Sequence, residues 1–337
     1  MRVLVVKMSS LGDIVHTLPA INDLAERYPQ IELDWLVDEG FAQIPTWHPV
    51  VNQVFALPLR RWKKNLFKAQ TWSEYRQFKQ QLIDQKYDYV IDAQGLLKSV
   101  FFAKKVQGHT HGYDAKSIRE PLASRFYDHT YSVSRQLHAV ERIRTLFAQV
   151  FEYEVDLDKV HYRLHLEPLA LSLAQKYIVF AHATTWEAKH FPENHWMSLA
   201  DLLQHSGVTI YLPWVNEEEK ARAQRIAQGR DWVELLPKVS LNQIAAVLQN
   251  ASAVVGVDTG LSHIAASVET PVVAIYGATS AGLARPYGER VLALQSDYHC
   301  SPCMKKHCRY VEQGDAQTPP CYDVIDLVQI KRQLELY

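Results

Sequence analysis

Residues 251–267 read ASAVVGVDTGLSHIAAS. Up to Val257 the stretch is apolar and β-branched, as a buried parallel strand requires. From Leu261 to Ala266 the apolar residues recur at helical spacing instead. The polar segment DTG (258–260) therefore joins a strand to a helix, and the junction predicts an α/β fold.

A junction of this kind presents free backbone N–H groups and the positive end of a helix dipole, which favours a phosphate. Gly260 would let a ligand approach the backbone, Thr259 offers a hydroxyl, and His263 lies on the first helical turn. In a simpler interpretation, Asp258 is a helix N-cap and His263 a core histidine. Asp-Thr-Gly also occurs in aspartic proteases, but those need two such loops in β-rich halves, so a protease is excluded.

The bulk composition sets the broad class of the protein. Its 337 residues suit two domains, and a formal net charge of −1 gives no global attraction to nucleic acid. The apolar run at residues 3–6 is too short for a signal peptide, and no later run approaches the length of a membrane span. We therefore expect a cytoplasmic protein with no nucleic-acid partner.

The N-terminal half begins with a second strand-loop-helix unit. A strand at 3–6 is followed by a polar turn at 7–13 and a helix from Ile14 to Ala25, and further strands are expected at 31–37, 52–57 and 87–92. Such doubly wound domains collect ligands at the carboxyl ends of their strands. No Gly-x-Gly-x-x-Gly occurs, which counts against a dinucleotide cofactor. Asp13 is either a helix cap or a general base.

Two polar stretches of this half have no single interpretation. Residues 60–72 (RRWKKNLFKAQTW) alternate basic with aromatic residues, which fits a solvated face, a nucleic-acid contact or a patch for an anionic amphiphile. Residues 108–142 hold polar side chains without metal-ligand spacing: His109, His111, Lys116, Arg119, His138 and Arg142.

Between about 152 and 175 the apolar periodicity ends and acidic residues take its place, as in a linker between domains. The boundary predicts an N-terminal domain at 1–160 and a C-terminal domain at 170–322. A last helix at 323–337 could pack on the first domain. The second half repeats the strand-loop-helix pattern, with a strand at 177–181, a polar loop at 182–192 and further helices and strands. A cleft between two such halves is the expected active site.

Several segments resemble the lipopolysaccharide heptosyltransferases, and together they cover most of the chain. The resemblance is carried by KMSSLGDIVHTLPA (7–20), WLVDEGFAQIP (35–45), RRW (60–62), DAQGLLKS (92–99), REPLAS (119–124), HAVER (138–142), HATT (182–185), the 189–196 segment and DTGLSH (258–263). The segments at 35–45 and 92–99 are closer to the first heptosyltransferase than to the second.

The resemblance implies a GT-B fold, two Rossmann-like doubly wound domains facing one another across a cleft. It implies an inverting glycosyltransferase that moves L-glycero-D-manno-heptose from ADP-heptose to the Kdo of Kdo-lipid A, with no metal ion required for catalysis. The partners would be ADP-heptose, Kdo-lipid A and the inner face of the inner membrane, on which the protein would be peripheral.

The resemblance also assigns roles to residues. Asp13 matches the general base, Lys189 a lysine on the donor phosphates, and Glu219 a carboxylate on the ribose. The donor-binding set is Thr184, Thr185, Lys189, Glu219, Asp258, Thr259, Gly260, Leu261 and His263. The acceptor-binding set is Ser10, Arg60, Arg61, Lys64, Arg119 and His138.

One feature departs from this pattern. The four cysteines follow the spacing Cys300-x2-Cys303-x4-Cys308-x12-Cys321. A structural zinc, free thiols and a disulfide are the alternatives. Cys-rich tails also suggest a second heptosyltransferase, acting on heptosyl-Kdo-lipid A. A sugar-nucleotide epimerase on the same fold is a further alternative, because a fold does not fix its chemistry.

Overall fold

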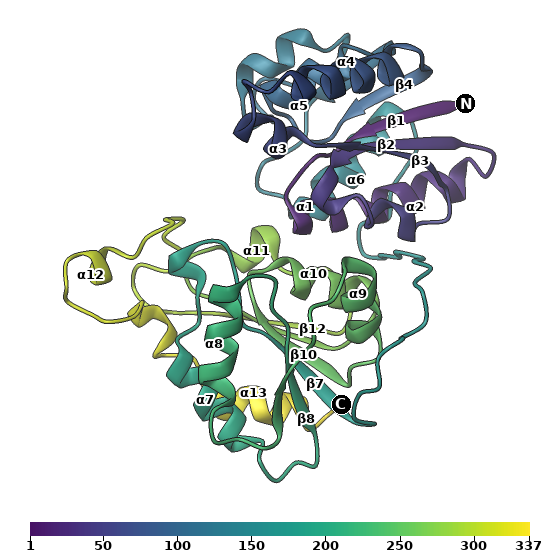
Figure 1. Cartoon of the computed structure of the whole chain (residues 1–337). Helices are drawn as coiled ribbons and strands as arrows, with labels where there is room; N and C mark the ends of the chain where they lie inside the picture. The colour runs from purple at the N-terminus through teal and green to yellow at the C-terminus, as the bar shows by residue number, and fades with distance from the viewer. The chain divides into compact units, whose positions relative to one another are not determined.

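The computed structural model describes residues 1–337, and the chain divides into two compact units, Met1–His165 and Leu166–Tyr337 (Figure 1). Each unit is built around one six-stranded parallel sheet. The border between the units falls within residues 152–175, the segment in which the sequence predicts a domain boundary.

The first unit has the strand order β3-β2-β1-β4-β5-β6. Helices cover both faces of the sheet, α3, α4 and α5 on one face and α2 and α6 on the other (Figure 1). Its strands are β1 (Arg2–Val6), β2 (Glu32–Asp38), β3 (Val51–Leu57), β4 (Lys86–Asp92), β5 (Gln107–Tyr113) and β6 (His129–Tyr131). Its helices are α1 (Leu11–Val15), α2 (Leu18–Arg27), α3 (Leu59–Lys64), α4 (Ala69–Ile83), α5 (Leu97–Ala103) and α6 (Ala139–Val150).

The second unit has the order β12-β11-β10-β7-β8-β9. Numbered within each unit, both sheets therefore read 3-2-1-4-5-6, the order of the Rossmann fold. The strands are β7 (Tyr177–Ala181), β8 (Thr209–Leu212), β9 (Val233–Leu235), β10 (Ala253–Val257), β11 (Val272–Tyr276) and β12 (Val291–Gln295). The helices are α7 (Glu193–Leu202), α8 (Glu217–Ala227), α9 (Leu241–Gln249), α10 (Gly260–Ser267), α11 (Ala281–Ala284), α12 (Arg309–Glu312) and α13 (Leu327–Leu334).

The apolar patterns explain which strands the sequence predicts. Strands such as β7 (YIVFA) and β10 (AVVGV) are buried along their whole length, as their apolar side chains require. Strand β5 (QGHTHGY) carries histidines and glycines, and its first three residues are exposed. It does not have the composition of a buried strand, which is why residues 108–142 show no strand signal.

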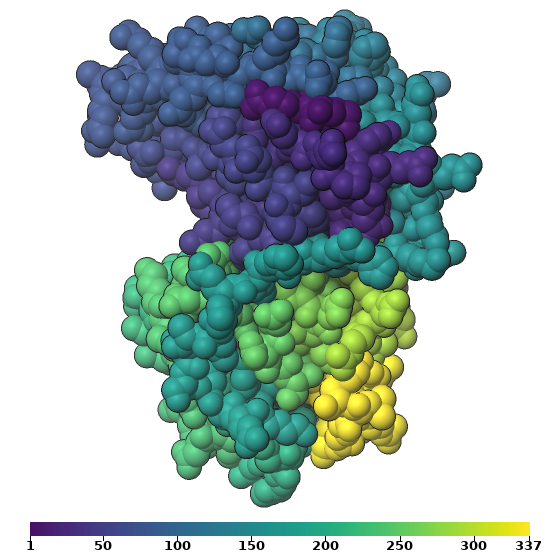
Figure 2. All heavy atoms as spheres, turned by 90° about the vertical axis from the view of Figure 1, so that its right-hand side faces the viewer, coloured from purple at the N-terminus to yellow at the C-terminus, as the bar shows by residue number.

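The last helix belongs to the core of the second unit. Ile330 of α13 is fully buried in the apolar cluster that also contains Trp196 of α7. Figure 2 shows the yellow C-terminal segment on the surface of this unit. The sequence suggests a return to the first domain, whereas the apolar face of α13 packs against α7. None of the helices has the length and apolar character needed to cross a membrane.

Candidate active site

The junction of β10 and α10 in the second unit is built as the sequence predicts. Thr259 is the N-cap residue of α10, and its side chain makes no capping hydrogen bond. The first backbone N–H groups of a helix lack partners within it and carry its positive dipole end. Gly256 allows close packing here, because a Cβ at this position would collide with Ser262 Oγ. The junction therefore leaves N–H donors for an anion.

Asp258 is not the cap of α10 but the centre of a polar cluster. Its Oδ2 accepts hydrogen bonds from Thr279 Oγ1 at 2.8 Å and from Lys189 Nζ at 3.2 Å. His263 Nε2 lies 3.8 Å from Asp258 Oδ1. Thr184 Oγ1 donates to the backbone oxygen of Asp258 at 2.9 Å. Two of the predicted donor-binding residues, Lys189 and His263, thus meet at the Asp258 carboxylate, and a third, Thr184, bonds the Asp258 backbone.

The electrostatics of this cluster keep Asp258 ionised. Burial raises the pKa of Asp258, but His263, Lys189 and Thr279 outweigh burial and lower that pKa to about 2. The Asp258 and Lys189 side chains are only 14% and 13% exposed. The carboxylate therefore orients the Lys189 ammonium in a nearly dry site, where an added phosphate would find both a cation and helix N–H groups.

The other predicted donor residues lie apart from the Asp258 cluster or have partners of their own. Glu219 lies in the first turn of α8, where its carboxylate accepts from Val215 N at 2.8 Å and from Asn216 Nδ2 at 3.0 Å. Thr185 is exposed, and Leu261 is half-buried beside Gly260 on α10. The ribose role of Glu219 stays a prediction.

Sequence reasoning missed Thr279 at this site. Thr279 follows β11, which pairs with β10, so the carboxyl ends of both strands lie at the same edge of the sheet. The signal was the apolar run VVAIY (272–276) followed by the polar Thr279.

In the first unit, Asp13 lies in the first turn of α1, the helix that follows the loop after β1. Asp13 Oδ2 accepts from Ser10 N and from Ser10 Oγ, both at 2.7 Å. Ser10 is the N-cap of α1, so the carboxylate also completes the start of that helix. Asp13 is therefore not the N-cap residue itself but the N3 residue of a capping box, and the general-base role is compatible with this contact because a carboxylate has further lone pairs.

Side chains from the β4–α5 loop hold the loop that carries Asp13. Gln94 Oε1 accepts from Met8 N and Ser9 N, both at 2.9 Å, and Lys98 Nζ donates to Ser9 Oγ at 3.2 Å. Lys7 is buried, and its Nζ donates to the Ala93 oxygen at 2.9 Å. Burial lowers the pKa of Lys7, although Asp13 and Asp92 act in the opposite direction. The roles of Gln94, Lys98 and Lys7 here were not predicted.

The predicted acceptor cations differ in how they are held. Arg60 pairs with Asp38 at 3.2 Å, and Arg61 pairs with Glu39 and Glu74. Lys64 and Arg119 are exposed and make no ion pair. His138 is only 4% exposed and caps α6, where its Nδ1 accepts from Val140 N at 3.1 Å.

The four cysteines are free thiols. Burial raises the pKa of Cys321 to about 12, and the other three thiols act in the same direction. Burial likewise raises the pKa of Cys300. Zinc binds thiolates, and no group of three or more Cys, His, Asp or Glu is arranged to hold a metal ion. A structural zinc at these cysteines stays a prediction, which elemental analysis would test.

Two Rossmann-like units with polar groups at the carboxyl ends of their central strands are the architecture of the GT-B fold. The solved structure of the E. coli heptosyltransferase WaaC with ADP matches with a TM-score of 0.82 and 45% identity, covering 87% of this chain and 93% of that one. WaaC with ADP-2-deoxy-2-fluoro heptose matches with a TM-score of 0.80 and 42% identity, covering 93% of this chain and all of the other.

Sequence comparison agrees with the structural match. The family model of glycosyltransferase family 9 (heptosyltransferase) matches residues 75–313. Lipopolysaccharide heptosyltransferase 1 of Pseudomonas aeruginosa is 44% identical, covering 99% of this chain and 97% of that protein. Lipopolysaccharide heptosyltransferase 2 of Salmonella typhimurium is 22% identical, covering 89% of this chain and 90% of that protein. The chain belongs to glycosyltransferase family 9 and is a glycosyltransferase.

Proposed function

We propose that this protein is the first heptosyltransferase of lipopolysaccharide inner-core synthesis, moving L-glycero-D-manno-heptose from ADP-heptose to the Kdo of Kdo-lipid A. The observation that carries the proposal is the 44–45% identity to proteins named lipopolysaccharide heptosyltransferase 1. The much lower identity to lipopolysaccharide heptosyltransferase 2 of Salmonella typhimurium favours the first enzyme over the second. Family membership favours transfer over epimerisation.

In this proposal Asp13 is the general base. The acceptor hydroxyl gives its proton to the Asp13 carboxylate while its oxygen forms the new bond to the anomeric carbon of the heptose. The bond from that carbon to the ADP phosphate breaks, and the configuration inverts. The two hydrogen bonds from Ser10 support this role, because they fix the carboxylate that must receive the proton.

The donor side stabilises the departing ADP. Negative charge grows on the phosphate as the glycosidic bond breaks, so the α10 N-terminus and Lys189 would act most strongly in the transition state. Asp258 supports this by holding the Lys189 ammonium at 3.2 Å. Because this set supplies positive charge from the protein itself, the proposal requires no metal ion, and turnover should persist in a chelator.

The acceptor side carries cations suited to Kdo carboxylates and lipid A phosphates. Arg60, Arg61, Lys64 and Arg119 are all exposed. Since the acceptor is a lipid, the enzyme would work as a peripheral protein on the inner face of the inner membrane.

The test is mass spectrometry of Kdo-lipid A after incubation with the purified protein and ADP-heptose. A gain of one heptose, absent with Asp13→Ala, is the expected result. A gain only on an acceptor that already carries one heptose would identify a second heptosyltransferase instead. No transfer to either acceptor would overturn the proposal.

A further inference from the structure

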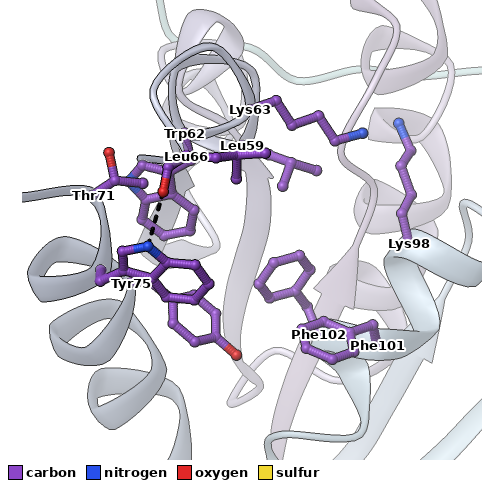
Figure 3. Close-up of a pocket in the computed structure, with 10 residues that line it drawn as sticks. Leu59, Trp62, Lys63, Leu66, Thr71, Tyr75, Lys98, Phe101 and Phe102 are labelled. Atoms are coloured by element: carbon purple, nitrogen blue, oxygen red, sulfur yellow. Dashed lines mark hydrogen bonds between the residues drawn. The ribbon is translucent and has the colours of Figure 1, made fainter. Parts of the chain in front are cut away.

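The first unit contains an apolar pocket that none of the assigned substrate-binding residues lines. Its volume is about 430 Å³, within the range of small-molecule sites. Ten residues from α3, the loop after it, α4 and α5 form its walls (Figure 3): Leu59, Trp62, Lys63, Leu66, Thr71, Trp72, Tyr75, Lys98, Phe101 and Phe102.

Large apolar side chains around this pocket face solvent. Phe67 is fully exposed, and Leu66, Trp72 and Phe101 are each about half exposed. The exposure is built into the structure, because Trp72 Nε1 donates to the Leu66 oxygen at 2.9 Å and fixes the loop in place. A contiguous apolar patch of this kind on a folded protein marks a contact with a partner.

Cations that have no acidic partner surround the same patch. Lys63, Lys64 and Lys68 are exposed and make no ion pair. Figure 3 shows the ammonium ends of Lys63 and Lys98 approaching one another at one side of the pocket. Burial, Lys63 and Arg60 together lower the pKa of Lys98, so the cations there repel one another. An anion bound between them would relieve this repulsion.

The charge and the apolar pocket together select the occupant. Nucleic acid would satisfy the lysines but leave the apolar pocket wet, and an uncharged apolar partner would leave the cations unpaired. A lipid with an anionic headgroup satisfies both. Basic residues beside aromatic ones are the usual composition of surfaces that bind anionic membranes.

We propose that the residues lining the pocket, together with Phe67 and Lys68, form a docking surface for an anionic bilayer, in which Phe67 and Leu66 enter the interface and the pocket takes a lipid acyl chain. The lysines of this docking surface would bind the phosphates of the headgroups. The inference deepens the proposed function, since it names the surface that brings the enzyme to a lipid acceptor, but it can be tested without any sugar substrate.

The test is cosedimentation of the full chain with phosphatidylcholine vesicles, with and without phosphatidylglycerol. We expect binding only to the vesicles that contain phosphatidylglycerol, and weaker binding at high salt. Phe67→Ser and Phe101→Ser should each weaken binding about tenfold, as expected when a large apolar side chain leaves hydrocarbon. Lys68→Gln should weaken binding about fivefold.

Matched controls lie in the same unit. Phe126 is 48% exposed, the same fraction as Phe101, but does not line the pocket. Phe126→Ser and Lys116→Gln should leave vesicle binding unchanged. Equal binding to neutral vesicles, or equal loss in variants and controls, would overturn the inference. So would a dimer that depends on Phe67 in a protein that does not bind vesicles.

A second assay separates the two proposals. Heptose transfer to a soluble, deacylated acceptor should persist in Phe67→Ser, because that reaction needs no bilayer. Vesicle binding with no heptose transfer to any acceptor would support the docking surface and contradict the proposed function. Heptose transfer without vesicle binding would support the proposed function and overturn the docking surface.

Discussion

The two units share one strand order but differ in how the charged side chains of their candidate binding surfaces are placed. In the second unit, Lys189 and His263 gather around the Asp258 carboxylate, and these side chains are almost completely buried. In the first unit, Lys63, Lys64 and Lys68 are exposed and have no acidic partner. Both units gather polar side chains after the first and fourth strands of the sheet, where the strand order reverses.

The difference indicates what each unit is built to bind. A cluster whose charges balance internally is already ordered before a ligand arrives, which suits a small phosphate group that must be held in one position. Exposed cations without partners are mobile and strongly hydrated, which suits a large anionic surface of variable structure. The same fold therefore supports a precise site and an adaptable one.

The largest expected effect is the loss of turnover when Asp13 in the first unit is replaced. Asp13→Asn keeps the size of the side chain but removes its basicity, so turnover should fall by about 10² or more. ADP binding should change little, because the proposed donor site lies in the other unit. Steady-state kinetics and calorimetry with ADP measure the two quantities, and near-normal turnover would remove the base assignment.

The next largest effect is expected in the Asp258 cluster, the proposed donor site. Lys189→Gln removes a charged hydrogen-bond donor worth about 1.5–3 kcal/mol, so kcat/KM for the donor should fall about 10- to 100-fold. The exposed Lys238 in the same unit offers a control, since Lys238→Gln should have no effect. A thermal melt of each variant checks folding. Equal kinetics for both variants would contradict the role of Lys189.

The acid stability of the second unit should depend on His182. This side chain is fully buried, and its Nε2 lies 3.0 Å from the Pro213 oxygen. Burial, with Arg222 nearby, lowers the pKa of His182 from 6.5 to about 3. Between these values the unfolded chain binds a proton that the folded chain does not. The free energy of unfolding should therefore decrease as pH falls below 6.5, by about 1.4 kcal/mol per pH unit.

Urea unfolding at pH 7 and pH 5.5 measures this slope. His182→Gln should lower stability at pH 7 but flatten the dependence on pH. Burial also lowers the pKa of His48 and of His111, each to about 4, so the first unit should lose stability over a similar range. An unchanged slope in the variant would show that His182 is already protonated in the folded state or exposed to solvent.

The smallest effect concerns an exposed cation. Lys64→Gln should raise the KM for the acceptor by no more than about fivefold, because exposed ion pairs contribute little. The effect should disappear at high salt, where such attractions are screened. A large effect that persists in salt would mean that Lys64 is desolvated when the acceptor binds.

The sequence predicts those parts of the fold that depend on local patterns. The junction at 258–260 follows from apolar periodicity, which the segment carries by itself. The single helix expected at 14–25 is instead two helices, α1 and α2, because the chain turns at residues 16–17, a break that the apolar periodicity does not show. The partnership of Thr279 with Asp258 does not follow, because it depends on which strands become neighbours. Likewise β5 carries polar residues, and only its pairing with β4 and β6 makes it a strand.

The position of α13 has a consequence for synthesis of the protein on the ribosome. The contacts within the first unit need no residue beyond His165, so this unit can fold while the rest is still being translated. The core of the second unit places Ile330 beside side chains from α7, near residue 196. That core stays incomplete until α13 has left the exit tunnel, so the second unit should be the part that depends on chaperones during biogenesis.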